Sequence, residues 1–342
     1  MPSPDADGPV RLLHLSDIHL RAGSAWDANP VLRDLARFIA GEVRHGLVPD
    51  LVAVTGDLAQ AGAADEYDLA GDWLSRVLWP VLTGDASKPL PCDRLLLVPG
   101  NHDVDRAQVG RPIRGTQQTL LAAAPGIAQD QVAEVLGDAD ERRRLLKRHA
   151  AYLDFYGDWL GLPPGEARSL PWWQRTIEIR GQRLHLAGLD SAWMACGDQD
   201  RGRLLLGRYQ INQTVQHPDG EGAHWRLALL HHPWDYLAEW ETRAVPQSIH
   251  LHRDLVLRGH VHEPDACRYL PPDPRRACVE LAAGSVYDGS PYDNAFHWIE
   301  LFPSPRRVLV HFRLWNRGTW EVDRNQPGCP NGTAQFPLPP RP

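Results

Sequence analysis

The apolar positions of the chain fall into short runs, and five of these runs are followed within three residues by an acidic, amide or histidine side chain. The runs are rich in Leu and Val and cover residues 12–15, 51–54, 95–98, 227–230 and 255–257. Runs of this length without polar alternation predict central strands whose two faces are both covered. Open α/β folds gather the carboxyl ends of such strands at one edge of the sheet, so we expect the polar residues to converge there.

Other segments of the chain predict what surrounds these strands. Apolar residues follow the helical repeat over residues 29–45 and 65–81, and two β-rich runs flank residues 180–183, which predicts a hairpin. Further strands are expected over residues 296–301 and 308–315, and these would complete a second sheet. The predicted fold class is therefore α/β, with two packed mixed β-sheets that form a sandwich flanked by helices.

The spacing of the motifs predicts one main domain over residues 10–325, preceded by a flexible N-terminus at residues 1–9. A helical, cap-like insertion is expected at about residues 104–170, where its place in the sequence suits a lid over the site. Its basic stretch, from Asp138 to Leu160, is interpreted as a solvated helix face or as an anion-binding surface. The Pro-rich tail at residues 326–342 is expected to be mobile, or a linker to a further domain.

Five polar motifs stand at the expected strand ends. They are Asp17-Ile18-His19, Gly56-Asp57, Gly100-Asn101-His102-Asp103, His231-His232 and Gly259-His260-Val261-His262. Each short motif alone is more typical of a loop or a helix cap. A given tetrapeptide such as Gly-Asn-His-Asp, however, occurs by chance in a chain of this length with a probability of about one in several hundred. The five motifs together, each at a strand end, therefore indicate a metal site.

The order of these motifs resembles that of the calcineurin-like metallophosphoesterases. The residues within the motifs are most similar to those of bacterial class III cyclic nucleotide phosphodiesterases and glycerophosphodiesterases. The resemblance extends from about Arg11 to Val286. It implies the αββα architecture of that superfamily and a centre of two metal ions.

The resemblance also implies which side chains hold the ions. The first ion would be bound by Asp17, His19, Asp57 and His262, and the second by Asp57, Asn101, His231 and His260. Asp57 would bridge the two ions. Of the adjacent pair, His231 is the expected ligand and His232 its neighbour, because similar enzymes place a single His one residue before a small residue and Pro.

The expected chemistry follows from such a centre. Two divalent ions about 3.5–4 Å apart lower the pKa of a shared water from 15.7 to about 7, so a bridging hydroxide is the expected nucleophile. His102 is expected to donate a hydrogen bond or a proton to the phosphoryl or leaving oxygen; the alternative is that it only supports Asn101. Asp103 either orients His102 or serves as a cap or turn residue. Nitrogen and oxygen ligands of this mixture suit Mn, Fe, Zn or Ni.

Composition narrows the class of partner. The net charge of −7 is mildly acidic, whereas a nucleic-acid-binding surface more often carries a basic excess. The chain has neither an apolar stretch of about 18 residues nor a secretory signal, so no membrane partner is expected. Five cysteines without a Cys-x-x-Cys pair favour reduced thiols. We therefore expect a cytoplasmic protein.

Three functions are consistent with these observations. The first is a metal-dependent phosphoric diester hydrolase that acts on a small diester, such as a cyclic nucleotide or a glycerophosphodiester. The second is a nuclease of the DNA-repair type with the same metal site, which a basic groove would favour. The third is a regulatory domain that keeps the fold without the chemistry, and its usual sign would be an incomplete ligand set.

Overall fold

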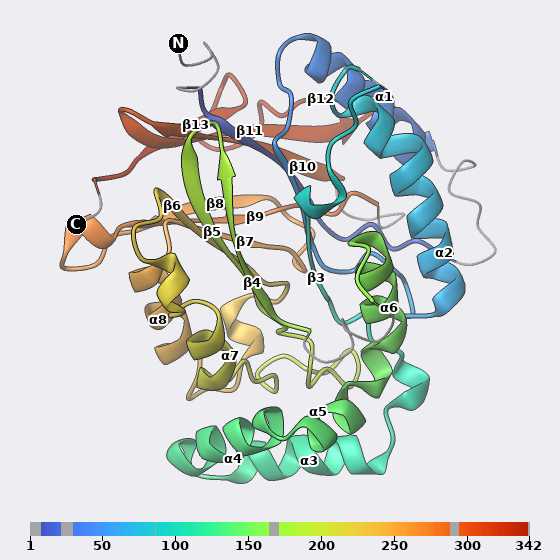
Figure 1. The fold of residues 1–342 in the computed structure, drawn as a ribbon, viewed down its shortest axis with the longest axis vertical. Coiled ribbons are helices and arrows are strands. Elements are labelled where there is room, and N and C mark those ends of the chain that lie inside the picture. Colours follow the sequence, from blue (N-terminus) through green and yellow to red (C-terminus); the bar gives the residue numbers. More distant parts are fainter. Residues whose placement is uncertain (1–7, 22–29, 86, 164–170, 288–293, 341–342) are drawn as a thin grey trace.

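Two mixed β-sheets packed face to face form the centre of the protein in the computed structural model, which describes residues 8–21, 30–85, 87–163, 171–287 and 294–340 (Figure 1). The first sheet has the strand order β12-β11-β10-β1-β2-β3, with β13 paired to β11. Its strands are β1 (Val10–Leu15), β2 (Leu51–Thr55), β3 (Leu95–Val98), β10 (Ala295–Pro303), β11 (Arg306–Asn316), β12 (Thr319–Val322) and β13 (Thr333–Pro337). The expected N-terminal arm lies, up to residue 7, outside the described residues.

The second sheet has the order β4-β5-β6-β7-β9-β8. Its strands are β4 (Trp173–Ile179), β5 (Gln182–Gly188), β6 (Trp225–Leu229), β7 (Leu255–Arg258), β8 (Asp265–Tyr269) and β9 (Cys278–Ala282). Strands β1, β2 and β3 run parallel to one another, as do β5, β6, β7 and β9. The predicted hairpin is present as the antiparallel pair β4–β5. The prediction of two packed mixed sheets flanked by helices is confirmed.

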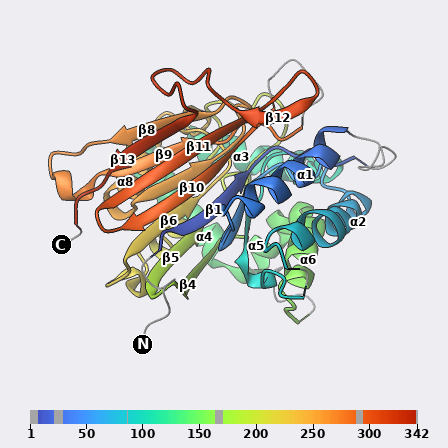
Figure 2. The ribbon, with the colours of Figure 1, turned by 90° about the horizontal axis from the view of Figure 1, so that it is seen from above.

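Helices flank the two sheets on their outer faces and at one end (Figures 1 and 2). They are α1 (Pro30–Arg44), α2 (Ala64–Trp73), α3 (Arg111–Ala122), α4 (Pro125–Gly137), α5 (Ala139–Leu145), α6 (Ala150–Trp159), α7 (Arg208–Gln213) and α8 (Ala244–His252). A π-helical turn, Leu74–Leu78, extends α2. No helix within these described ranges is both long and apolar enough to cross a lipid bilayer.

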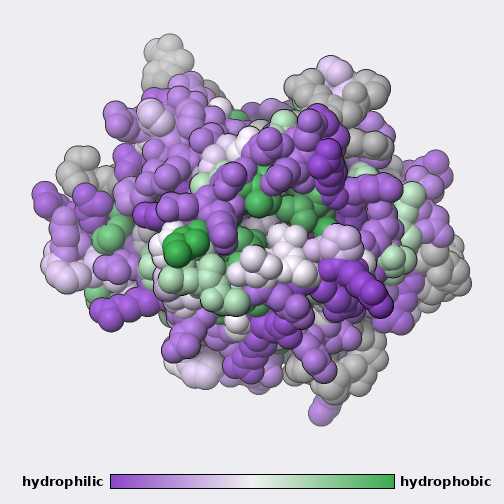
Figure 3. Space-filling view, turned by 90° about the horizontal axis from the view of Figure 1, so that it is seen from below, coloured by the Kyte–Doolittle hydropathy of each residue, from purple (hydrophilic) through white to green (hydrophobic). Residues whose placement is uncertain are grey.

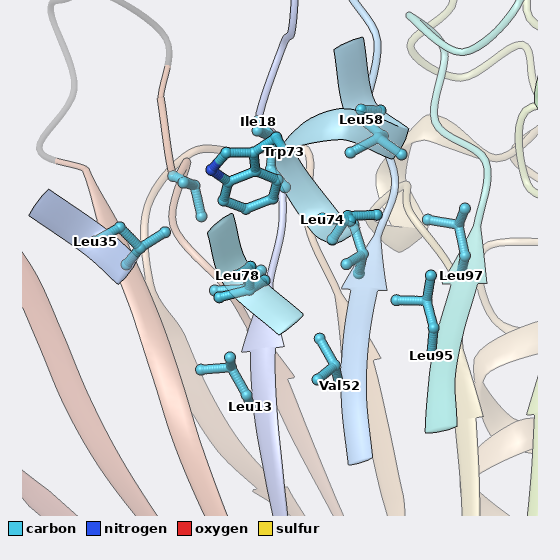
Figure 4. Packing of buried hydrophobic residues seen from close by; sticks show 14 of the residues in the cluster. Leu13, Ile18, Leu35, Val52, Leu58, Trp73, Leu74, Leu78, Leu95 and Leu97 are labelled. Carbon is cyan, nitrogen blue, oxygen red and sulfur yellow. The ribbon is translucent and has the colours of Figure 1, made fainter. Parts of the chain in front are cut away.

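The core explains why the central strands contain so few polar residues. All five residues of β2 are buried, because alternate side chains enter two different clusters. Leu51 and Ala53 pack between the sheets, whereas Val52 and Val54 pack against the helices. Figure 4 shows the helix side, where Trp73 lies over the strands that carry Leu13 and Val52.

The expectation of a mobile Pro-rich tail is wrong for residues 333–337. These residues form β13, which pairs antiparallel with β11 from Arg307 to His311. Phe336 packs against the cluster between the sheets, and the side chain of Leu338 is buried in it. Burial of these apolar side chains and the ladder of backbone hydrogen bonds hold the segment in place despite its many prolines.

The insertion is helical as expected: α3, α4 and α5 lie at the lower end of the molecule in Figure 1, and α6 runs up from them beside α2. Buried polar side chains attach it to the loop after β5: Arg148 donates to the carbonyls of Trp193 and Ala195, and Gln117 donates to that of Met194. Figure 3 shows this end of the molecule as largely hydrophilic, with apolar side chains near its middle. The basic stretch is thus divided, since Arg143 is exposed on the solvated face while Arg148 points inward.

Candidate metal centre

All seven side chains expected to bind metal lie at the carboxyl ends of parallel strands. Asp17 and His19 follow β1, Asp57 follows β2 and Asn101 follows β3. From the second sheet, His231 follows β6, and His260 and His262 follow β7. Backbone hydrogen bonds join the loops, because the amides of Ile18 and His19 both donate to the carbonyl of Asp57 at 2.9 Å. The two sheets therefore contribute their ligands to one place.

The side-chain atoms of this group form two neighbouring sets around Asp57. On one side, Nε2 of His262 lies 3.1 Å from Oδ1 of Asp17, and Nε2 of His19 lies 4.0 Å from Oδ2 of Asp57. On the other side, Nε2 of His231 lies 3.2 Å from Oδ2 of Asp57 and 3.1 Å from Nδ1 of His260. The carboxylate of Asp57 is thus shared by both sets, as a bridging ligand requires.

Several of these residues have a backbone conformation that L-amino acids rarely adopt. The φ angle is positive at Asp17, His19, Asp57, His260 and His262, with values from 50° to 75°. Such residues cost of order 1–3 kcal/mol each and persist where the surrounding structure holds them, typically at functional sites. The fold therefore holds these five residues in backbone conformations that reduce its stability.

Glycines before the ligands allow the loops to approach closely. A Cβ on Gly56 would lie 2.3 Å from Nδ1 of His231, and one on Gly259 would lie 1.9 Å from Oγ of Ser16. A Cβ on Gly100 would lie 2.1 Å from Oδ1 of Asp57. Only a residue without a side chain fits at these positions.

The polar atoms that converge here fit a metal centre. Four buried side-chain atoms in the described part of the chain lack a hydrogen-bond partner at this point: Oδ1 of Asp17, Nδ1 and Nε2 of His19, and Oδ1 of Asn101. Buried polar atoms are nearly always paired, and leaving one unpaired costs about 1–3 kcal/mol. Carboxylate oxygens, amide oxygens and imidazole nitrogens carry lone pairs. A group of such atoms that face one another without hydrogen bonds is suited to divalent ions.

The charges of the site also suit cations. Burial alone would raise the pKa of Asp17, but the nearby His262 and His231 outweigh it and lower that pKa to about 2. Burial likewise opposes ionisation of Asp57, yet the charge of His231 brings its pKa well below the ordinary value. Both carboxylates are therefore ionised at neutral pH, which attracts metal ions to the site.

His102 lies beside this centre, as expected. Its backbone amide donates to Oδ1 of Asp57 at 2.8 Å, and its ring meets that of His19 edge-on, with centroids 4.8 Å apart. Its Nδ1 lies 2.7 Å from the carbonyl oxygen of Gln60, so Nδ1 carries a hydrogen and Nε2 is directed elsewhere. The ring is thus fixed in place with one nitrogen available for chemistry.

Asp103 was expected either to orient His102 or to serve as a cap or turn residue, and its hydrogen bonds correspond to the second role. Its carboxylate accepts hydrogen bonds from the backbone amides of Ala59 and Gly100 and from the hydroxyl of Tyr67. All of these hydrogen bonds join Asp103 to groups other than His102. The side chain is completely buried, and burial raises its pKa to about 6. Asp103 therefore ties together the loops after β2 and β3, which corresponds to the turn-residue alternative.

A cleft of about 430 Å³ opens over the metal centre. Its lining includes predicted site residues together with Gly197, Asp198, Asp200, His232 and Tyr236. Sequence reasoning missed the loop around Asp198, because it follows β5 without a recognisable motif. The helices α3 to α6 contribute none of the described lining residues, so the insertion supports the wall of the cleft from behind instead of forming the expected lid.

A buried network next to the site links two of the ligand loops. Glu280 of β9 accepts hydrogen bonds from Trp234 at 2.8 Å, from His250 at 2.8 Å and from Arg258 at 2.7 Å. Trp234 follows the loop of His231, and Arg258 immediately precedes that of His260. Burial opposes ionisation of Glu280, but these donors outweigh it and lower its pKa to about 2.

Replacing Glu280 by Gln is expected to destabilise the fold at neutral pH. The pKa of about 2, against an ordinary 4.5, corresponds to about 3 kcal/mol of unfolding free energy, to order of magnitude. Because the folded pKa is the lower one, this contribution is present above pH 4.5 and is lost as the pH falls toward 2. Urea unfolding of wild type and Glu280→Gln should therefore differ most near pH 7 and converge under acidic conditions. A matched change at the exposed Glu178 should have little effect at any pH; a difference for Glu280→Gln that does not depend on pH would contradict the charge argument.

Comparison with known proteins identifies the class to which this fold and site belong. The calcineurin-like phosphoesterase family matches residues 10–264. This range contains all seven residues expected to bind metal, strands β1 to β3 of the first sheet and strands β4 to β7 of the second. The chain therefore belongs to the calcineurin-like phosphoesterase family, a family of metallophosphoesterases. No curated protein is similar enough to the chain to count as a match.

Solved structures resemble the chain only distantly. Zinc-bound Vps29 from Entamoeba histolytica is 14% identical with a TM-score of 0.38, and the alignment covers 92% of this chain and 97% of that one. A predicted phosphoesterase from Streptococcus pneumoniae is 14% identical with a TM-score of 0.31, over 96% and 98% of the two chains. Sulfate thiohydrolase SoxB from Thermus thermophilus is 14% identical with a TM-score of 0.42, over 97% of this chain and 57% of that one. Similarity at this level is too low to transfer what those proteins bind or catalyse.

Proposed function

We propose that the protein is a phosphoric diester hydrolase that uses two metal ions and acts on a small diester, such as a cyclic nucleotide or a glycerophosphodiester. The observation that carries this proposal is the meeting of seven potential ligands around the shared carboxylate of Asp57, with buried donor atoms that have no other partner. The resemblance of the motifs to those of class III phosphodiesterases supports a diester substrate. A complete ligand set also argues against a regulatory domain that has lost its chemistry.

In this proposal the first ion is held by Asp17, His19, Asp57 and His262, and the second by Asp57, Asn101, His231 and His260. When bound, two divalent ions supply an activated water for attack and positive charge for the phosphoryl oxygens. The ions would be Mn, Fe, Zn or Ni, because the ligands are carboxylate, amide and imidazole.

The cleft favours a small substrate over nucleic acid. Lysine and arginine are missing from its described lining, whereas Asp198 and Asp200 are present. Nucleic-acid binding draws most of its affinity from basic side chains that contact several phosphates in a row. A substrate with a single phosphodiester group avoids that requirement. The cytoplasm is the proposed location, which the five free cysteines support.

Metal analysis followed by a substrate panel tests this proposal. The purified protein, supplied with manganese, would be assayed on bis-p-nitrophenyl phosphate, cyclic AMP, glycerophosphocholine and single-stranded DNA. We expect two bound ions and turnover of one or more small diesters in preference to DNA. Preferential cleavage of DNA would favour the nuclease alternative, and bound metal without turnover of any substrate would favour the regulatory one.

His102 is proposed to protonate the leaving oxygen. Nδ1 already carries a hydrogen toward the carbonyl of Gln60, so a second proton on Nε2 is the one available for transfer. His102→Ala should retain both ions and slow hydrolysis of diesters with alkyl leaving groups by on the order of 10²-fold. The loss should be much smaller for p-nitrophenyl diesters, because p-nitrophenolate leaves without a proton. Equal losses for the two leaving groups would remove His102 from proton transfer.

A further inference from the structure

Two histidines stand side by side at the end of β6, and their hydrogen bonds give them opposite tautomers. Nδ1 of His231 lies 2.7 Å from the carbonyl oxygen of Thr55. A carbonyl oxygen only accepts, so Nδ1 of His231 carries a hydrogen, and Nε2 is the nitrogen left to bind a metal ion. That Nε2 faces Asp57 and His260, as expected of a metal ligand.

His232 has a different partner at the same atom. Oγ of Ser191 lies 2.9 Å from its Nδ1, and the same Oγ accepts the backbone amides of His231 at 3.3 Å and of His232 at 3.1 Å. A hydroxyl has two lone pairs and one hydrogen. Both lone pairs are used by the amides, so the hydroxyl hydrogen is donated to Nδ1 of His232. The hydrogen of the neutral His232 ring is therefore on Nε2.

This tautomer decides what His232 can bind. The ring belongs to a trio with His231 and His260 whose nitrogens are close enough to hold an ion. However, with Nδ1 occupied by Ser191 and a hydrogen on Nε2, His232 has no lone pair to give to a metal. It offers an N–H donor instead.

The ring of His232 lies at the wall of the cleft. His232 lines the cleft together with His102 and His260. Its ring packs against the rings of His260 and Tyr236, with centroid distances of 4.7 Å and 5.7 Å. These contacts hold the orientation of the imidazole plane. Lysine and arginine are missing from the described lining, so an N–H donor here would add to the charge of the metal ions in binding an anionic group.

We propose that His232 donates a hydrogen bond from Nε2 to a phosphoryl oxygen of the substrate, and that Ser191 is a positioning residue that selects the donating tautomer. This inference rests on the proposed phosphoesterase function, since it names the group that the donor contacts. It adds a substrate-binding role to a residue that adjoins the metal ligands without being one of them.

The tautomer can be measured without turnover. In zinc-loaded protein with nitrogen-labelled histidines, long-range proton–nitrogen correlation NMR separates rings with hydrogen on Nε2 from rings with hydrogen on Nδ1. We expect the Nε2 form for His232 in wild type and a mixture of forms in Ser191→Ala. Ser285→Ala is the matched control, because that buried hydroxyl donates to the carbonyl of Asp17 and should leave the His232 signal unchanged. A hydrogen on Nδ1 in the wild type would overturn the assignment.

The donor role is tested by binding inorganic phosphate to the zinc-loaded proteins in a calorimeter. His232→Leu should keep both ions and bind phosphate on the order of 10- to 100-fold more weakly, the scale of one hydrogen bond to a charged group. His232→Gln, whose amide is a donor, should recover part of that loss. Loss of metal in the folded His232→Gln or His232→Leu protein, or unchanged phosphate affinity in both, would overturn the proposal. If wild type shows the tautomer and the phosphate affinity but hydrolyses no diester, the proposed function fails while the donor role stands.

Discussion

Asp57→Asn is expected to lose bound metal and turnover together. The substitution keeps the size of the side chain and the oxygen that accepts the backbone amide of His102 at 2.8 Å. It removes the negative charge shared by the two sets of ligands, and it places either an amide nitrogen or an uncharged oxygen opposite His231 and His19. Both sites lose the same ligand, so hydrolysis should fall by roughly 10³-fold or more, the upper range for removing one main stabiliser of a transition state.

Metal content by elemental analysis and initial rates on a small diester are the measurements. Asp198→Asn is the matched control, because Asp198 also lines the cleft but pairs with Arg106 at 2.6 Å and belongs to neither set. The control should retain both ions. Asp57→Asn protein that still holds two ions per chain would contradict the bridging position of this carboxylate.

Gly100→Ala is expected to disrupt the same carboxylate from the opposite side. The added methyl would lie 2.1 Å from Oδ1 and 2.6 Å from the backbone nitrogen of Asp57. One of these atoms is backbone that is tied to the loop after β1, so the clash cannot be relieved by rotating a side chain. Overpacking of this kind costs about 1–3 kcal/mol of stability. A displacement near 1 Å at the reacting groups costs about 10²-fold in rate.

The matched control is a glycine at which an added side chain would contact no other atom. Gly115 in α3 has no atom within 4 Å of an added Cβ, so Gly115→Ala should fold, bind metal and turn over substrate like wild type. Thermal unfolding, metal content and rate would be measured on both variants. Gly100→Ala with full metal content and an unchanged rate would show that Asp57 is not confined as closely as its neighbours indicate.

Much of the fold was predictable because its signal is local. Each apolar run predicted a central strand, and all five runs coincide with β1, β2, β3, β6 and β7 to within two residues at either end. The polar motifs could be placed for the same reason, since each lies within a few residues of the end of its strand, and the resemblance to a known family then named seven expected ligands among them. The tail was predicted less well, because its prolines outnumber the few apolar side chains, such as Phe336, that hold β13 in place.

The site was less predictable wherever its order depends on distant partners. Nothing in the local sequence marks Asp17 or His260 as left-handed, because neither is glycine. Asp103 looked like a partner for its neighbour His102, but its carboxylate turns toward backbone amides and Tyr67. A short motif gives the type of side chain, whereas its direction is set by the elements packed around it.

The sequence by itself determined the class of fold and the strand ends that carry polar motifs, and its resemblance to the metallophosphoesterases named the side chains expected to bind metal. The fold class and the strand ends follow from the hydrophobic period and from residue type, which are local properties of the sequence. Only the tertiary structure decided which nitrogen of each histidine faces the cleft and which residues hold it there. The reason is physical: His231 is oriented by the hydrogen bond that it donates to the carbonyl oxygen of Thr55, 176 positions away, and His232 by its hydrogen bond with Ser191 in the loop after β5, 41 positions away.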